Sequence, residues 1–190
     1  MPGKVSVIIP NYNHGNFLSE RIASVLSQSF ADFECIILDD ASTDNSLDII
    51  KEFASKDKRI SFSKSASNSG SPFIQWNKGV QMAKGKYTWI AESDDKADPC
   101  FLETLLNQLE ANPKAGLAYC QSYKMNKDGI VTGSWKQWTD ELDESIFEAD
   151  FTMDGRKYIE QFLIHRNTIP NASAVVFRKD IYKLLKITRP

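Results

Sequence analysis

The sequence predicts an α/β fold in which a mostly parallel central sheet carries helices on both faces. Short apolar runs alternate with segments whose apolar residues return every three or four positions, as in amphipathic helices. Parallel strands need a long crossover between them, and a helix of this kind supplies it. Several apolar runs end in polar or acidic residues, which is typical of the ligand-binding edge of an open α/β sheet.

Four strands separated by three helices are expected in the first half of the chain. The strands are the short apolar runs at residues 5–10, 33–38, 59–63 and 87–91. The helices are expected at residues 17–28, in a segment from residue 44 onward, and at residues 72–83. Asn16 is a candidate cap for the first helix and Thr43 or Asp44 for the second, and Gly85 is placed to end the third. One face of the third helix is expected to carry Phe73, Trp76, Val80 and Ala83.

The second half of the chain has a weaker pattern. A helix that stops near residue 112 and a strand at residues 116–120 are expected first. Lys127, Asp128 and Gly129 have the composition of a hairpin turn, with a returning strand at 130–132. Residues 134–154 show no clear period, which predicts a long loop over the site. The last expected elements are a helix at 155–165, a strand at 174–177 and a helix at 180–185.

Length and composition indicate a globular protein of one domain. The chain has 190 residues, of which 42% are hydrophobic and 11% aromatic, so a sizeable core can form. Its 23 basic and 25 acidic residues nearly balance, which gives no support for nucleic-acid binding. Cys35, Cys100 and Cys120 lack the spacing of zinc ligands or of a disulfide framework. No apolar run is long enough to span a membrane, so we expect a soluble, cytoplasmic protein.

An acidic stretch, Glu92-Ser93-Asp94-Asp95, follows the fourth apolar run at the edge where a ligand is expected. Three acids within four residues repel one another unless a cation compensates them. Carboxylate oxygens suit Mg²⁺ or Mn²⁺, which usually share their coordination with substrate phosphates. Acidic clusters are also common at helix N-termini, so a solvated turn that caps the following helix is the alternative.

Four motifs taken together resemble those of family 2 glycosyltransferases, which have the Rossmann-like GT-A fold. They are V-S-V-I-I-P-N-Y-N at residues 5–13, D-D-A-S-T-D at 39–44, N-S-G at 68–70 and E-S-D-D at 92–95. Each motif is weak alone, and their order and spacing carry the resemblance. It implies one GT-A domain over residues 1–190, with a nucleotide-sugar-binding half at 1–98 and an incomplete acceptor-side half at 99–190.

The resemblance also implies a reaction. An enzyme of this family, of the bacterial polysaccharide type, would move a hexose with inversion from a nucleotide sugar, most readily a UDP-sugar, to a glycan or lipid-linked acceptor. Mn²⁺ or Mg²⁺ would neutralise the charge that develops on the leaving nucleoside diphosphate. The expected setting is cell-envelope polysaccharide biosynthesis in the cytoplasm, with peripheral association at the inner face of the membrane left open. The alternative function is a module that binds a nucleotide sugar without catalysis.

Residues that match family positions are the candidates for the donor and metal sites. The donor-binding candidates are Pro10, Tyr12, Asp40, Asn68 and Asp94, and the metal-binding candidates are Asp95 and Asp94. Tyr12 would stack on the base, although a half-exposed loop aromatic is its structural alternative. Asp40 would accept a hydrogen bond from the base edge, with Asp39 ranked behind it and Asp44 expected only as a cap.

The chain departs from the family pattern at three points. Glu92 replaces the first Asp that many relatives carry in an Asp-x-Asp pattern, which keeps the charge and lengthens the side chain. The stretch Gln75-Trp76-Asn77-Lys78 lacks the Arg that often precedes this Asn, so Lys78 is either its substitute or a solvated helix lysine, and Trp76 is expected in the core. The general base usually follows the last strand, so it is expected beyond Pro190 and the catalytic residue stays unknown.

Acceptor-side residues are harder to assign. Trp135 and Trp138 could stack on a sugar ring, although one of them could equally belong to the core. The segment at residues 171–173 could line the acceptor site. His165 is expected at the surface or as a helix cap, and Asp180 as a cap.

Overall fold

The computed structural model describes residues 3–143 and 145–184 of the chain. By internal contacts the chain divides into two compact units, which we describe separately. Unit 1 comprises the described parts of residues 1–118 and 175–190, and unit 2 comprises residues 119–174. The boundary expected at residue 98 therefore falls inside unit 1. Among the described residues, no helix is long and apolar enough to cross a membrane.

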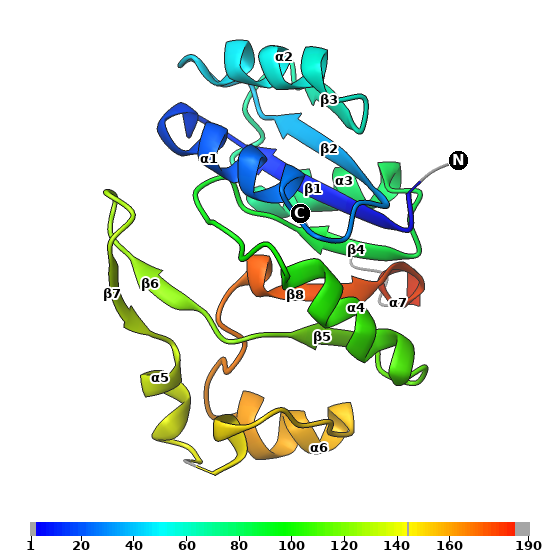
Figure 1. The fold of residues 1–190 in the computed structure, drawn as a ribbon, viewed down its shortest axis with the longest axis vertical. Coiled ribbons are helices and arrows are strands. Elements are labelled where there is room, and N and C mark those ends of the chain that lie inside the picture. The colour runs from blue at the N-terminus through cyan, green and yellow to red at the C-terminus, as the bar shows by residue number, and fades with distance from the viewer. Residues whose placement is uncertain (1–2, 144, 185–190) are drawn as a thin grey trace. The chain divides into compact units, whose positions relative to one another are not determined.

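A central six-stranded sheet with the order β3-β2-β1-β4-β8-β5 organises unit 1 (Figure 1). Its strands are β1 (Val5–Asn11), β2 (Phe33–Asp39), β3 (Ile60–Lys64), β4 (Tyr87–Ile90), β5 (Leu117–Tyr119) and β8 (Val175–Arg178). The four strands from β3 to β4 are parallel, whereas β8 pairs antiparallel with β4. The expectation of a mostly parallel sheet is thus confirmed, and the carboxyl ends of β1, β2 and β4 lie at one edge.

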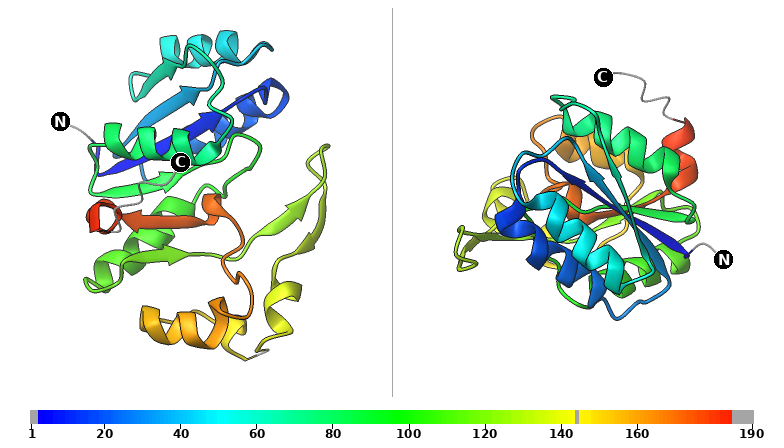
Figure 2. Two further views of the ribbon diagram at one scale, coloured as in Figure 1. Left: turned by 180° about the vertical axis from the view of Figure 1, so that it is seen from behind. Right: turned by 90° about the horizontal axis from the view of Figure 1, so that it is seen from above.

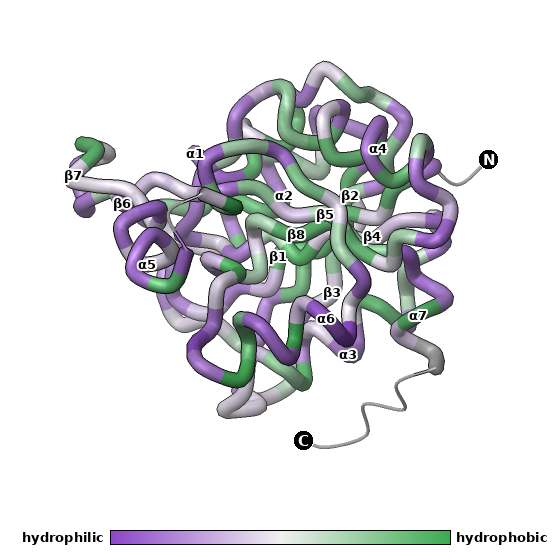
Figure 3. Tube along the Cα trace, turned by 90° about the horizontal axis from the view of Figure 1, so that it is seen from below, coloured by the Kyte–Doolittle hydropathy of each residue, from purple (hydrophilic) through white to green (hydrophobic). Residues whose placement is uncertain are grey.

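Helices cover both faces of this sheet, as expected. Unit 1 contains α1 (Gly15–Leu26), α2 (Ser46–Lys56), α3 (Pro72–Met82), α4 (Phe101–Ala111) and α7 (Lys179–Leu184). The view in Figure 2 places α1 and α2 on one face and α3 on the other. Most side chains of the strands between these helices are buried and aliphatic. The hydrophobic residues of β1 and β8 accordingly appear green in Figure 3.

Close packing of α3 against β1 overturns one expectation about the helix faces. A Cβ atom on Gly79 would lie 2.4 Å from Cγ2 of Ile8, so α3 approaches the sheet through Gly79 and Val80. Gln75, one turn earlier, is buried on the same side. Phe73 is exposed and does not share the buried face of Val80 and Ala83. Trp76 is only half-buried, so the expectation that it lies in the core was wrong.

Helix ends differ from the predicted caps in detail. α1 begins at Gly15 after His14, so Asn16 lies inside the first turn instead of capping it. Asp44 accepts hydrogen bonds from the backbone N–H groups of Gly15 and Ser46, both at 2.9 Å, and so fixes the starts of α1 and α2 together. α7 begins at Lys179, before Asp180, and its expected end at residue 185 lies outside the described residues.

Gly85 has a role other than the predicted helix stop. α3 already ends at Met82, and Gly85 has no left-handed backbone. A Cβ atom on Gly85 would lie 2.7 Å from the backbone nitrogen of Ser6 and 2.8 Å from the carbonyl carbon of Val5. The absence of a side chain thus lets the turn before β4 contact the start of β1.

Unit 2 contains short elements around its own aromatic cluster. They are β6 (Tyr123–Met125), β7 (Val131–Ser134), α5 (Lys136–Asp140), α6 (Gly155–Tyr158), and the short helices η1 (Ile146–Glu148), η2 (Ile159–Leu163) and η3 (Ala172–Ala174). β6 and β7 form the expected hairpin, with Gly129 at a positive φ in the turn. Phe147, Tyr158 and Phe162 are buried together. Residues 134–154 are therefore not the structureless loop that was expected.

Candidate functional site

A pocket of about 380 Å³ lies at the carboxyl-end edge of the sheet in unit 1. Its lining comes from the end of β1, from the loops after β1, β2, β3 and β4, and from the start of α3. The lining residues are Pro10, Asn11, Tyr12, His14, Asp40, Asn68, Gly70, Ser71, Pro72, Gln75, Glu92 and Ser93. Four of the predicted donor-binding residues, Pro10, Tyr12, Asp40 and Asn68, are thus brought to one pocket. Asp94 and Asp95 are not among its lining residues.

The loops after β1 and β2 form one hydrogen-bonded wall. Nδ2 of Asn11 donates to Asp39 at 3.2 Å and to the hydroxyl of Ser42 at 3.1 Å. Oδ1 of Asn13 accepts from the backbone N–H of Thr43 at 2.8 Å. Asp39 is fully buried, so its role here is structural. Asn13 and Ala41 have positive φ values of 56° and 63°, and such strained backbone is common at functional sites.

Asp40 is buried at the back of the pocket and is held by three hydrogen bonds. The backbone N–H and the hydroxyl of Ser69 donate to Oδ2 at 2.9 and 2.6 Å, and Nε2 of Gln75 donates to Oδ1 at 2.5 Å. A carboxylate has about four acceptor positions, two on each oxygen, so Ser69 fills those of Oδ2 and Oδ1 can accept one further hydrogen bond. These hydrogen bonds fix the orientation of the Asp40 carboxylate, which can accept a hydrogen bond from an N–H group of a ligand.

Tyr12 and Asn68 lie at the mouth of this pocket. The Tyr12 side chain is 44% exposed, which leaves a ring face available for stacking and also agrees with its structural alternative. Nδ2 of Asn68 donates to the backbone oxygen of Asp40 at 3.4 Å, and Oδ1 of Asn68 accepts from Gly70 N–H at 2.7 Å. Gly70 has a φ of 69°, so this turn requires a residue that tolerates left-handed backbone.

The acidic stretch forms the loop after β4, beside a buried arginine. Arg21 is fully buried, with its guanidinium 4.9 Å from the ring centroid of Trp89. Burial lowers the pKa of Arg21 to about 10, while the charges of Asp95 and Glu92 act in the opposite direction. Arg21 therefore stays protonated at neutral pH and offsets part of the negative charge of the loop.

Glu92 is the acid of this loop that reaches the pocket. The indole Nε1 of Trp76 donates a 2.6 Å hydrogen bond to Oε1 of Glu92. Burial raises the pKa of Glu92 to about 7, the bond from Trp76 lowers it, and the charges of Asp94 and Asp95 raise it. The lengthened side chain thus ends at a defined partner on α3, which a search for Asp-x-Asp spacing could not indicate.

Asp94 and Asp95 suit a metal site that a substrate completes better than a metal site formed by protein ligands alone. Within residues 3–143 and 145–184, no three His, Cys, Asp or Glu side chains gather as a metal-binding group. Mg²⁺ commonly uses one or two carboxylates together with substrate phosphates and water. Asp94 is exposed and Asp95 half-buried, so both carboxylates are accessible for such a role.

Four pocket contacts were missed by sequence reasoning. They involve His14 with Ser93, Ser69 and Gln75 with Asp40, and Trp76 with Glu92. Each joins segments that lie between 16 and 79 residues apart in the chain. Periodicity and short motifs describe neighbours in sequence, so no local signal marked these pairs.

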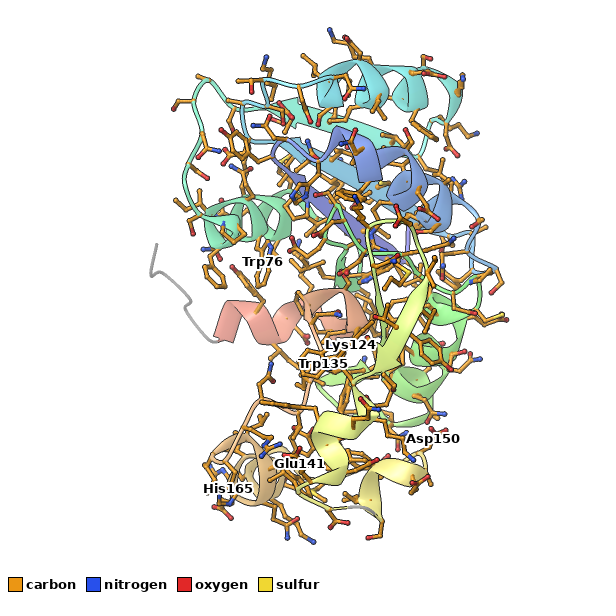
Figure 4. The ribbon with its side chains drawn as sticks, turned by 90° about the vertical axis from the view of Figure 1, so that its left-hand side faces the viewer. Trp76, Lys124, Trp135, Glu141, Asp150 and His165 are labelled. Atoms are coloured by element: carbon orange, nitrogen blue, oxygen red, sulfur yellow. The ribbon has the colours of Figure 1, made fainter. Side chains whose placement is uncertain are left out.

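Other candidates are not among the residues that line the pocket. Lys78 donates to the hydroxyl of Ser63 at 3.1 Å and does not line the pocket, and its role as a substitute for the missing Arg stays a prediction. In unit 2, Trp138 is exposed and Trp135, which is labelled in Figure 4, is half-buried. Their ring centroids lie 5.9 Å apart, and neither is a fully buried core residue. His165 is exposed, as expected. Oδ1 of Asn171 accepts from Ala174 N–H at 2.8 Å, which closes the turn before β8.

Comparison with known proteins gives several relatives that are named as glycosyltransferases. The poly(ribitol-phosphate) beta-glucosyltransferase of Bacillus spizizenii is 29% identical over 168 residues, which are 87% of this chain and 26% of that protein. S. aureus TarS 1-349 in complex with UDP matches with a TM-score of 0.74 and 22% identity, over 98% of this chain and 50% of that one. The mannosyltransferase PcManGT from Pyrobaculum calidifontis, in complex with GDP-Man and Mn²⁺, matches with a TM-score of 0.66 and 16% identity, over 98% and 47%.

These matches define the fold and the family. The chain spans about half the length of the two solved structures and about a quarter of the Bacillus protein. The likeness to TarS identifies the sheet of unit 1 and its helices as the GT-A fold. The model of the family described as "Glycosyl transferase family 2" matches residues 6–184. The chain therefore belongs to glycosyl transferase family 2.

Proposed function

We propose that this chain binds a UDP-sugar and transfers its hexose, with inversion, to a glycan or lipid-linked acceptor in cell-surface polysaccharide synthesis. The pocket around Asp40 is the observation that carries the proposal. It combines a buried, oriented carboxylate with an accessible aromatic ring, the two groups that a nucleotide base needs for recognition. TarS, which shares the fold, has been solved with UDP and with UDP-GlcNAc, and the Bacillus relative acts on poly(ribitol-phosphate).

In this proposal the base enters between Tyr12 and Asp40. The Tyr12 ring stacks on the base, and the free acceptor position on Oδ1 of Asp40 takes a hydrogen bond from a ring N–H. Pro10 closes the inner wall, and Asn68 lies near the base or ribose. Ser69 and Gln75 keep the Asp40 carboxylate in place when no ligand is bound, so little reorganisation is needed on binding.

Asp94 and Asp95 would hold the Mn²⁺ or Mg²⁺ that belongs to the proposal, with Asp95 as the main ligand. A bound divalent ion supplies charge neutralisation for the leaving nucleoside diphosphate. Asp94 and Asp95 belong to the loop that follows β4, which ends at Ile90. The positive charge of Arg21 limits the repulsion among the acids of the loop.

Titration calorimetry with UDP, in the presence and absence of Mn²⁺, tests the proposal. The wild type should bind UDP much more tightly with Mn²⁺, and Asp95→Asn should remove that gain. Asp48→Asn, at an exposed position of α2, is the matched control and should leave the gain unchanged. The assignment of Asp95 would be rejected if the UDP affinity of the wild type did not change with Mn²⁺. It would also be rejected if Mn²⁺ raised the UDP affinity of Asp95→Asn as much as that of the wild type.

A turnover assay separates the enzyme from the binding module. Release of UDP from a panel of UDP-hexoses and UDP-N-acetylhexosamines, with and without a poly(ribitol-phosphate) acceptor, would be followed by a coupled assay. A rate of UDP release above that of the Asp94→Asn and Asp95→Asn double variant supports sugar transfer. Tight metal-dependent binding with no turnover would instead favour the non-catalytic nucleotide-sugar-binding module.

A further inference from the structure

Two aromatic side chains stand beside the pocket on α3 and are not buried. Phe73 is 55% exposed, and Trp76 is half-buried on the side of α3 that is turned away from β2 and β3 (Figure 4). Their ring centroids are 5.0 Å apart, with an interplanar angle of 73°. Large aromatic side chains are usually placed inside a protein, so an exposed pair with a defined geometry calls for an explanation.

The Trp76 indole is fixed in orientation by the pocket wall itself. Its Nε1–H donates to Oε1 of Glu92 at 2.6 Å, and Glu92 lines the pocket. Pro72 and Gln75, which alternate with the aromatic pair along α3, also line it. The aromatic surface therefore begins where the pocket ends, and Glu92 is common to both.

We propose that Phe73 and Trp76 form a subsite for a hexopyranose ring of a substrate, with Glu92 at its polar edge. The proposal rests on the proposed function, because it names where a sugar bound next to the nucleotide pocket would lie. A pyranose ring has an apolar face of C–H groups, which packs on an aromatic ring, and hydroxyl groups around its rim, which donate to a carboxylate. The three side chains supply both features within one short stretch of surface.

The fixed geometry favours a bound sugar over nonspecific contact. A ring held by a hydrogen bond loses little conformational freedom when a ligand packs on it, so its contact contributes fully to affinity. Truncation of one such aromatic contact is expected to weaken sugar binding by about fivefold to tenfold. The sugar can belong to the donor or to the acceptor, since both carry the same ring chemistry.

Two binding measurements distinguish these sources. In the donor arm, calorimetry with Mn²⁺ compares UDP with a panel of UDP-hexoses and UDP-N-acetylhexosamines, and the ratio of affinities isolates the contribution of the sugar. In the acceptor arm, saturation-transfer NMR follows methyl glucoside and methyl N-acetylglucosaminide in the presence of saturating UDP and Mn²⁺. Trp76→Ala, Phe73→Ala and Trp76→Phe are compared in both arms.

The expected result is a loss of the sugar contribution in one arm, by about fivefold to tenfold in Trp76→Ala and Phe73→Ala, with UDP affinity unchanged. Trp76→Phe keeps a ring without the N–H group and should fall between wild type and Trp76→Ala. Phe62→Ala, which removes an exposed aromatic from β3, is the control and should bind like wild type.

Unchanged UDP affinity also serves as the test that the variants are folded. If neither arm shows a sugar contribution that depends on Phe73 or Trp76 while UDP still binds, the subsite is overturned and the proposed function stands. If the wild type fails to bind UDP at all, the proposed function itself is rejected.

Discussion

The imidazole Nδ1 of His14 lies 2.6 Å from the hydroxyl oxygen of Ser93, and this contact joins the loop after β1 to the acidic loop after β4. Both residues line the pocket, and Ser93 is buried. The His14 ring also meets Phe17 of α1 edge to face, at 6.3 Å between centroids. His14 therefore links the wall of the pocket to the loop that carries Asp94 and Asp95.

Removal of this link should weaken metal-dependent nucleotide binding. In His14→Ala and in Ser93→Ala the acidic loop loses a hydrogen bond of about 1 kcal/mol, so UDP affinity with Mn²⁺ should fall about fivefold by calorimetry. His165→Ala replaces the second histidine of the chain, which is exposed in unit 2, and should bind UDP like wild type. Equal affinities in all three variants would show that the contact does not position the loop.

Glu92 should make stability depend on pH. Its pKa of about 7 lies above the ordinary value of 4.5 chiefly because of burial, so the folded protein binds an extra proton between these values. The stabilising contribution of protonated Glu92 is complete below pH 4.5 and is lost as the pH rises through 7. Urea unfolding in EDTA should therefore show a larger decrease in stability between pH 5 and pH 8 in wild type than in Glu92→Gln.

The control for this prediction is Glu103→Gln, at an exposed position of α4. That variant should keep the wild-type difference between the two pH values. A Glu92→Gln variant with the same pH dependence as wild type would mean that Glu92 does not change its proton uptake on folding.

Gly85→Ala should destabilise unit 1. The added methyl group would meet backbone atoms of Val5 and Ser6 at less than 3 Å, and the paired strand β1 cannot move aside as a side chain could. A loss of about 2 kcal/mol in the free energy of unfolding is expected from thermal or urea denaturation. Gly155→Ala is the matched control, since nothing lies within 4 Å of its added Cβ, and should be neutral or slightly stabilising.

The fold of unit 1 could be predicted because its signals are local. Runs of β-branched residues and helical spacing are properties of neighbouring residues, and the strands β1, β2 and β4 lie within two residues of their expected positions. The edge at which a ligand is expected was predicted from the same pattern, because parallel strands place their carboxyl ends together. Pro10, Tyr12, Asp40 and Asn68 were found in one pocket for this reason.

The misassigned residues depend on contacts that spacing cannot describe. The spacing of Phe73 and Trp76 agrees with a buried helix face, yet Gln75 is buried instead because Asp40 supplies its hydrogen bond and Gly79 permits close packing on Ile8. Residues 134–154 lack a period because their side chains join an aromatic cluster from short, irregular elements. Asp94 and Asp95 are still assigned by motif alone.

The two ends of unit 2 lie next to each other, since the backbone N–H of Cys120 donates to the carbonyl oxygen of Ala174 at 3.1 Å. The chain leaves the sheet after β5 and returns at β8, its neighbour. A segment with adjacent ends can be lengthened, shortened or replaced without a change in the strand order or in the pocket of unit 1. Evolution could thus exchange residues 120–174 as a cassette while the sheet of unit 1 and its pocket are retained.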